Sequence, residues 1–397
     1  MSGTSGDPTC PACTSGDLRI FHHQSSVPVN SCLLLEDERE AREFPRGALT
    51  LAVCHACGVI TNLDFDAALI EYSDRYEETQ AFSARFNEFA GTLARRWVEE
   101  YRLSGESVLE IGSGKGEFLA LMAEAGIGAG TGIDPAISLD RLDHTDDARL
   151  TWIADSFDDD WAAGDGAGLA PAAIVCRHTL EHIAPVADFV ASIRRYIGDA
   201  DTVVLFELPD TSRVLDEVAF WDVYYEHCTY FTEGSLARLF ERCGFVILDI
   251  RREYDGQYLI LEARPRRTGE AAVPWPADDL AATLAGVARF RAGYAEMVAT
   301  WRGRLAQREG AGPAVIWGAS SKGVAFLAEL GDHVAAAVDI NPHKQGMFTA
   351  GTGHRIIAPA DLPRLAPDLV VVMNPVYLAE IGAQLASLDI HATVLAL

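Results

Sequence analysis

The chain has 397 residues, 49% of them hydrophobic and 23% charged, which is typical of a globular protein with two or three domains. Its 58 acidic residues outnumber 32 basic ones, and the formal net charge of -26 argues against nucleic acid as a partner. No apolar run reaches the roughly 18 residues that suggest a membrane span. Because residues 1–7 also lack the features of a secretory signal, we expect a cytoplasmic protein without a membrane partner.

Four of the eight cysteines form two close pairs near the start of the chain, Cys10-Pro-Ala-Cys13 and Cys54-His-Ala-Cys57. A Cys-x-x-Cys turn directs two thiolates at one tetrahedral metal, and two such turns make a closed four-sulfur site. The sequence therefore predicts structural zinc, with the intervening segment forming a small hairpin insertion. The alternative is four unrelated thiols. We expect His22 and His23 to lie in a loop.

The middle of the chain alternates apolar runs with helical patterns. An amphipathic helix is expected over 80–101, and further helices are expected after Gly116, Ala184 and Thr232. The expected strands are Ser107–Ile111, Gly128–Ile133, Ala172–Cys176 and Thr202–Glu207. This alternation predicts an α/β fold with a doubly wound, mostly parallel sheet.

A glycine-rich loop follows the first of these strands, with the sequence Glu110-Ile-Gly112-Ser-Gly114-Lys-Gly116. The dinucleotide fingerprint is G-x-G-x-x-G and places a diphosphate at a helix N-terminus. Here the spacing is G-x-G-x-G, and Glu110 stands two residues before the first glycine. An acid there repels a diphosphate and suits an ammonium group, which points to S-adenosylmethionine. The alternative for the glycines alone is a plain tight turn.

Four further residues extend this predicted cofactor site. Asp134 ends the next strand, where a carboxylate can accept both ribose hydroxyls. In the segment Asp155-Ser156-Phe157, the acid could accept a hydrogen bond from the adenine amino group, with the aromatic ring nearby. Residues 155–160 contain several other acids, so the role of Asp155 stays open.

Two histidine-bearing stretches are candidates for proton transfer. His178 and His182 follow an expected strand at the sheet edge where open α/β sheets bind ligands. The second stretch contains Tyr224, Glu226 and His227, and a histidine near neutral pKa is the usual general base. Each histidine can instead be a structural residue. Tyr72 and Tyr76 can reach the same cleft or serve as core aromatics.

A second, smaller Rossmann-like unit is expected at the C-terminus. A proline-bearing linker over 264–276 and a long helix over 278–308 precede the strands Ala314–Trp317, Val334–Asp339 and Leu369–Met373. The turn Gly318-Ala-Ser-Ser-Lys322-Gly323 can cradle a phosphate or sugar, or be ordinary turn chemistry. The roles of Lys322 and Lys344 stay open. The predicted domains are 1–75 (zinc-binding), 76–265 (cofactor-binding), 266–310 (helical linker) and 311–397.

The order of these motifs resembles the three-domain sugar C-methyltransferases of antibiotic deoxysugar pathways. The resemblance covers nearly the whole chain and rests on CxxC…CxxCG, VLEIGSGKGEFL, RHTLEHI, YEHCTYFT and GASSKG…DINPHKQG. It implies methylation of a carbon beside the ketone of a nucleotide-linked keto sugar, with His227 as the base. It further implies supporting roles for Glu226 and Tyr224, a pocket lined by His178, His182 and Tyr76, and a nucleotide between the middle and C-terminal domains.

Three segments depart from the pattern of this family, and they leave other substrates open. They are Tyr254–Tyr258, Ala350–Thr352 and Cys228-Thr229. The alternatives are an O- or N-methyltransferase of another natural product and a non-catalytic scaffold with a zinc module. As partners we expect a small molecule and, for the chain itself, a monomer or homodimer.

Overall fold

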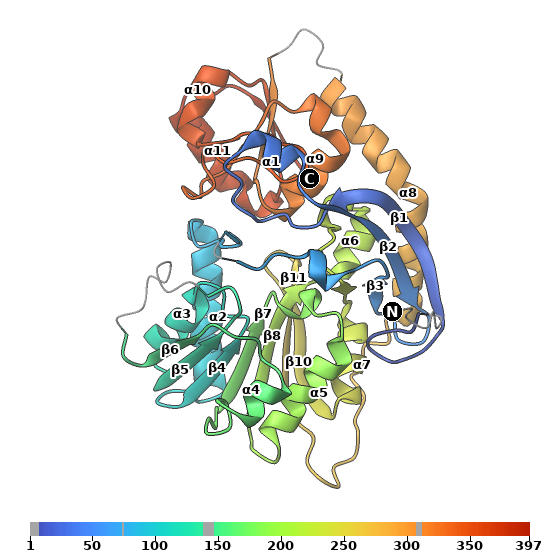
Figure 1. Ribbon diagram of the computed structural model, residues 1–397, viewed down its shortest axis with the longest axis vertical. Helices are drawn as coiled ribbons and strands as arrows, with labels where there is room; N and C mark the ends of the chain where they lie inside the picture. The colour runs from blue at the N-terminus through green and yellow to red at the C-terminus, as the bar shows by residue number, and fades with distance from the viewer. Residues whose placement is uncertain (1–7, 74, 138–146, 307–311) are drawn as a thin grey trace.

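The computed structural model describes residues 8–73, 75–137, 147–306 and 312–397. These residues form a four-stranded, a seven-stranded and a five-stranded sheet. Figure 1 shows the seven-stranded sheet below, the C-terminal unit above it, and the N-terminal strands at one side beside the long helix α8 (Leu280–Ala306). Within the described residues, none of the helices is long and apolar enough to cross a membrane.

The N-terminal sheet is antiparallel in the order β1-β2-β3-β9, and it combines distant parts of the chain. Its strands are β1 (Leu18–Pro28), β2 (Arg46–Cys54), β3 (Ile60–Asn62) and β9 (Thr229–Tyr230), with helix α1 (Glu38–Arg42) between β1 and β2. The expectation that His22 and His23 lie in a loop is wrong, because both belong to β1. His22 is buried against Phe290 and Tyr294 of α8. This packing partner lies far along the chain, so the local sequence, which is polar, did not indicate a strand here.

The seven-stranded sheet has the order β10-β11-β8-β7-β4-β5-β6. Its strands are β4 (Ser107–Ile111), β5 (Ala129–Ile133), β6 (Leu150–Ile153), β7 (Ala173–Arg177), β8 (Val203–Pro209), β10 (Phe245–Glu253) and β11 (Tyr258–Pro265). The five strands from β8 to β6 are parallel, as expected, and β11 and β10 add an antiparallel hairpin at one edge. The expected linker over 264–276 therefore begins inside β11.

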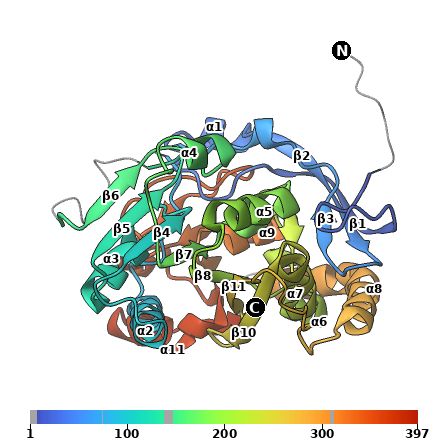
Figure 2. The same ribbon diagram turned by 90° about the horizontal axis from the view of Figure 1, so that it is seen from below.

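Helices cover both faces of this sheet, so its central strands are apolar on both sides (Figure 2). Helices α2 (Ala84–Glu100) and α3 (Glu117–Ala125) pack on one face. The other face carries α4 (Asp159–Ala163), α5 (Val186–Ile197) and α7 (Glu233–Arg242). The short helix α6 (Thr211–Glu217) follows β8 and contacts α8.

The C-terminal unit is a parallel sheet in the order β14-β13-β12-β15-β16. Its strands are β12 (Ala314–Trp317), β13 (Ala336–Val338), β14 (Ile356–Ile357), β15 (Leu369–Val372) and β16 (Thr393–Ala396). Its helices are α9 (Ser321–Leu330), α10 (Leu362–Leu365) and α11 (Leu378–Ser387). Backbone hydrogen bonds join it to the N-terminal part, since Phe348 N donates to Leu35 O and Gly351 N donates to Ala41 O.

Candidate active site

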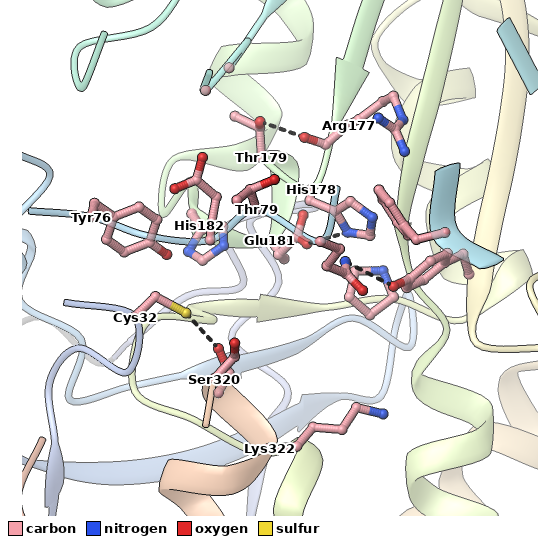
Figure 3. Close-up of a pocket in the computed structure, with 18 of the residues that line it drawn as sticks. Cys32, Tyr76, Thr79, Arg177, His178, Thr179, Glu181, His182, Ser320 and Lys322 are labelled. Carbon is pink, nitrogen blue, oxygen red and sulfur yellow. Dashed lines mark hydrogen bonds and ion pairs between the residues drawn. The ribbon is translucent and has the colours of Figure 1, made fainter. Parts of the chain in front are cut away.

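One cavity of about 540 Å³ lies where the loops after the parallel strands of the two α/β units meet. Such loops, beyond the carboxyl ends of the strands, are the usual ligand site of open α/β sheets. Figure 3 shows Tyr76, His178 and His182 on one side of this cavity, and Ser320 and Lys322 from the C-terminal unit on the other. The cofactor loop and the segment with His227 also line it, so a single space brings together motifs from three parts of the sequence.

The glycine-rich loop has the tight geometry that its sequence predicts. Gly112, Gly114 and Gly116 have φ angles of 72°, 51° and 75°, a region that L side chains rarely adopt. Gly112 N donates to Ile133 O, and α3 begins directly after Gly116. Gly112 and Gly114 line the cavity, whereas Gly116 packs against the ring of Trp152.

Gly112→Ala is expected to destabilise the fold more than an equivalent change at a glycine with free space. A Cβ at Gly112 would lie 2.0 Å from Thr179 Oγ1, whereas a Cβ at Gly105, with φ 80°, meets no atom within 4 Å. Gly105→Ala should cost about 1–2 kcal/mol for the left-handed backbone alone. Gly112→Ala should cost about 1–3 kcal/mol more through the steric overlap. Urea unfolding measures both, and equal losses would contradict this geometry.

Glu110, the last residue but one of β4, has a buried carboxyl group whose Oε2 has no hydrogen-bond partner among the described residues. Burial raises its pKa to about 8, although Arg177 acts in the opposite direction. An acceptor left without a donor in a buried site fits a ligand that supplies one, such as an ammonium group. Asp134 lies nearby, where Oδ2 accepts from Gly114 N at 3.0 Å and Oδ1 from Ala136 N at 2.7 Å.

The remaining predicted cofactor residues differ in their placement. Ser156 and Phe157 line the cavity, whereas Asp155 is exposed, lies outside the lining and accepts from Ser156 N. The predicted adenine-reading role of Asp155 therefore has no support in the geometry. Neighbouring Ser156 and Phe157 are the residues of that segment that can contact a ligand.

His178 is held as a cation between two carboxylates. Its Nε2 lies 2.8 Å from Glu207 Oε1, and its Nδ1 lies 3.7 Å from Glu181 Oε1. Burial disfavours the charged form, but Glu207 and Glu181 outweigh it and raise the pKa to about 9. With both nitrogens facing acceptors, His178 is suited to positioning and electrostatics and not to removing a proton.

The environment of His227 favours the neutral imidazole, whereas that of His178 favours the cation. Its ring is buried among Tyr224, His182 and Tyr230, with centroid distances of 4.5, 4.8 and 5.8 Å. Burial and the neighbouring His182 lower its pKa to about 3, so the imidazole is neutral near pH 7. Within the described chain neither ring nitrogen forms a hydrogen bond, and the side chain lines the cavity. His227 can therefore accept a proton from a bound molecule.

Glu226 faces away from its neighbour His227. Its Oε1 accepts from Ser31 N at 2.7 Å, and its Oε2 accepts from Tyr76 OH at 3.0 Å and from Asn30 Nδ2 at 3.3 Å. Among the described residues no hydrogen bond joins it to His227, so any support it gives runs through Tyr76. Tyr224 OH donates to Asp222 Oδ1 at 3.0 Å while its ring packs on His227.

The C-terminal wall carries two lysines in different surroundings. Lys322 Nζ lies 3.1 Å from Asp222 Oδ2 and 3.2 Å from Gln257 Oε1. Lys344 is 3% exposed, and its Nζ donates to Ser320 Oγ at 2.5 Å. In the described part of the chain no ion pair involves Lys344.

Several residues in or next to this cavity were not predicted as site residues. Glu181, Asp222, Arg213 and Gln257 line it, and Asn30 and Ser31 contact Glu226 outside the lining. Glu181 stands inside the predicted stretch between His178 and His182 and could have been found by its position. Asn30 and Ser31 reach Glu226 only through long-range folding and carry no local signal.

The four paired cysteines come together outside the lining of this cavity. Cys10 Sγ lies 3.6 Å from Cys57 Sγ, Cys13 Sγ lies 3.5 Å from Cys54 Sγ, and the four sulfurs lie within 4.8 Å of one another. Zinc–sulfur bonds of about 2.3 Å in a tetrahedron place sulfurs about 3.8 Å apart, so the donor set fits this metal. Arg238 and Arg242 of α7 donate to Cys57 O and Cys13 O, which joins the cluster to the middle domain.

Comparisons with known proteins agree with this architecture. Residues 82–250 match a family model described as a methyltransferase domain, and residues 278–393 match one described as a C-methyltransferase C-terminal domain. The C-methyltransferase NovU from Streptomyces niveus is 27% identical over 94% of this chain and 90% of its own. The predicted resemblance to C-methyltransferases is thereby confirmed.

The similar solved structures named here each cover less than half of this chain. A 1,6-didemethyltoxoflavin-N1-methyltransferase from Burkholderia thailandensis has 18% identity over 47% of this chain and 83% of its own, with a TM-score of 0.37. Magnesium protoporphyrin IX methyltransferase from Synechocystis PCC 6803 has 16% identity over 46% of this chain and 84% of its own, with a TM-score of 0.35. At these scores the assignment rests on the two family models and on the full-length relative. The chain is therefore an S-adenosylmethionine-dependent methyltransferase that carries the C-terminal domain of the C-methyltransferases.

Proposed function

We propose that this enzyme transfers a methyl group to a carbon atom of a nucleotide-linked keto-deoxysugar. The observation that carries the proposal is the buried ammonium of Lys344, which has a hydroxyl partner and no ion pair within the described residues. Burying a charge without a counterion is costly unless a ligand supplies one. Because Lys344 lines the same cavity as the cofactor loop, an anionic part of the substrate is the ligand that fits.

The surroundings of Lys344 suit a diphosphate. Lys322 adds a second cation, and Ser320 and Ser321 stand at the N-terminus of α9, whose ten residues direct their dipole toward the cavity. These groups place two lysines and a helix N-terminus on one wall of the cavity, in a chain with a net charge of -26. A nucleoside diphosphate bound there leaves the attached sugar directed toward His227.

The chemistry on the sugar begins with proton removal. A ketone acidifies the neighbouring C–H bond, and neutral His227 takes that proton as a general base. The electron pair of the C–H bond passes into the enolate, whose negative charge favours the imidazolium that has just formed. S-adenosylmethionine, when bound, supplies an electrophilic methyl group on a positively charged sulfur for this carbon. Tyr76, held by Glu226, and Tyr224, held by Asp222, shape the pocket around the reacting atoms.

Glu110 is the proposed partner of the cofactor's ammonium group, and proton release on binding tests this. Its pKa of about 8 leaves it mostly protonated at pH 7, and a bound cation lowers that pKa. Binding of S-adenosylhomocysteine should thus release close to one proton at pH 7 and almost none at pH 9, and affinity should rise up to about pH 8. Calorimetry in two buffers of different ionisation enthalpy measures the release. A release that persists in Glu110→Gln would contradict the assignment.

We also propose that Cys10, Cys13, Cys54 and Cys57 hold one structural zinc ion. Four thiolates leave no open position for chemistry, and three of the residues are buried. Metal analysis should find one zinc per chain in the wild type. Cys10→Ser should reduce this content and the melting temperature, whereas Cys243→Ser, outside the cluster, should keep the zinc. Zinc-free wild-type protein of unchanged stability would overturn the proposal.

Calorimetric titration with S-adenosylhomocysteine and then with thymidine diphosphate tests the substrate class. Binding of both supports an enzyme of nucleotide-linked sugars. Binding of S-adenosylhomocysteine alone would indicate that the substrate is another small molecule and would favour O- or N-methylation. Binding of neither would contradict the proposed function.

A further inference from the structure

Three potential metal ligands converge beside the proposed base. Glu181 and His182 belong to the short 3-10 helix η3 (Leu180–His182) after β7, and His227 stands just before β9. Their ligand atoms lie within 4.8 Å of one another. Cys228 N donates to Glu181 O at 2.9 Å, so a backbone hydrogen bond holds the two segments together. Figure 3 shows Glu181 and His182 side by side at the cavity.

The carboxylate of Glu181 is only partly satisfied. Its side chain is 3% exposed, its Oε1 faces His178, and its Oε2 has no hydrogen-bond partner in the described residues. Buried polar atoms are almost always paired. A buried oxygen without a partner, in a residue that lines the cavity, therefore indicates a donor or cation that completes it.

The two histidines are free to coordinate. His182 Nδ1 lies 3.0 Å from Tyr72 OH, which orients the ring and leaves Nε2 for a ligand, as outer partners do in metal sites. His227 uses neither nitrogen for a hydrogen bond within the described residues. Two imidazoles and one carboxylate are a common donor set for Zn²⁺, Co²⁺ and Ni²⁺, and three protein ligands leave one position open.

We propose that Glu181, His182 and His227 bind a divalent transition-metal ion, and that the bound ion inhibits methyl transfer. The inhibitory part rests on the proposed function, because the metal bond occupies the His227 lone pair that takes the substrate proton. The site is separate from the four-cysteine cluster, whose thiolates prefer to retain zinc.

Cobalt titration of the zinc-loaded, full-length protein tests the binding. Wild type should take up one Co²⁺ whose visible absorption lacks sulfur-to-cobalt charge-transfer bands. Glu181→Gln and His182→Gln should each weaken this binding by at least about 10-fold, since even outer partners contribute that much. His391→Ala removes an exposed histidine outside the site and should bind as wild type does. Absence of this ion, or equal affinity in all variants, would overturn the proposal.

Activity separates this inference from the proposed function. Added Co²⁺ should abolish methyl transfer by wild type, and a weak chelator that leaves the zinc in place should restore it. Binding without inhibition would overturn the inhibitory role and, with it, His227 as the base. Failure of Co²⁺ to bind would overturn the metal site and leave methyl transfer untouched. Binding of S-adenosylhomocysteine by each variant shows that it is folded.

Discussion

Replacement of His227 with alanine is expected to lower kcat by about 100- to 10,000-fold, the usual contribution of a general base. Affinity for S-adenosylhomocysteine should stay within about twofold of wild type, because His227 is not part of the glycine loop that we propose binds the cofactor. The ring lines the cavity and burial lowers its pKa to about 3, so it is neutral near pH 7. Steady-state kinetics and calorimetry give the two values.

Solvent exchange distinguishes a base from a residue that only shapes the pocket. With S-adenosylhomocysteine bound, wild type in D₂O should exchange the proton beside the substrate ketone, and His227→Ala should not. Glu226→Gln is the informative comparison, since Glu226 contacts Tyr76 and Ser31. It should retain exchange at a reduced rate. Exchange and turnover of His227→Ala within about threefold of wild type would show that another group is the base.

Lys344→Met is expected to weaken substrate binding and stabilise the ligand-free protein. Loss of a hydrogen bond to a charged group costs about 1.5–3 kcal/mol, so KM for the nucleotide sugar should rise about 10- to 150-fold. Ser320 is the one hydrogen-bond partner of this buried side chain in the described part of the protein, and a well-packed apolar chain there should be neutral or favourable. Kinetics and thermal unfolding measure the two effects.

Lys322→Met is the matched control for stability. Lys322 pairs with buried Asp222, so its loss removes one of the two cations that pair with this carboxylate among the described residues and should lower the melting temperature. Both variants should bind thymidine diphosphate more weakly. If Lys344→Met destabilises the free protein as much as Lys322→Met and leaves KM unchanged, then Lys344 is a structural residue and the diphosphate site lies elsewhere.

The cofactor half of the site could be predicted because its signals are local. The strand predicted over 107–111 coincides with β4, since a buried parallel strand is a continuous apolar run that ends at glycine. Glu110 lies in this strand, and the glycines follow it directly in the sequence. The C-terminal strand 314–317 was predicted for the same reason.

The edge hairpin β10–β11 was not predicted because its charged residues interrupt the apolar pattern that is typical of a strand. Glu262 is fully buried in β11, where Trp97 Nε1 donates to it at 2.8 Å and Tyr101 and Arg251 complete its partners. This compensation comes from α2 and from a neighbouring strand. A single-sequence pattern contains no information about it, so the segment does not resemble a strand.

The surroundings of His227 depend on contacts that span most of the chain. Tyr230 in β9 pairs with Ile60 in β3, and the next residue before β9, Cys228, donates its N–H to Glu181 O. These contacts join the N-terminal sheet to the middle domain and aim His227 into the cavity. The sequence predicted His227 as a candidate base. It could not predict that the side chain of Glu226 contacts Ser31 and Tyr76, because these contacts form only in the folded chain.

Product analysis with ¹³C-methyl-labelled S-adenosylmethionine tests the central claim most directly. The enzyme is incubated with a thymidine diphosphate 4-keto-6-deoxy sugar, and carbon NMR locates the label. Our account predicts a new methyl group bonded to a ring carbon beside the ketone, formed by wild type and not by His227→Ala. A label on oxygen or nitrogen, or no transfer to this substrate by protein that binds S-adenosylhomocysteine, would contradict it.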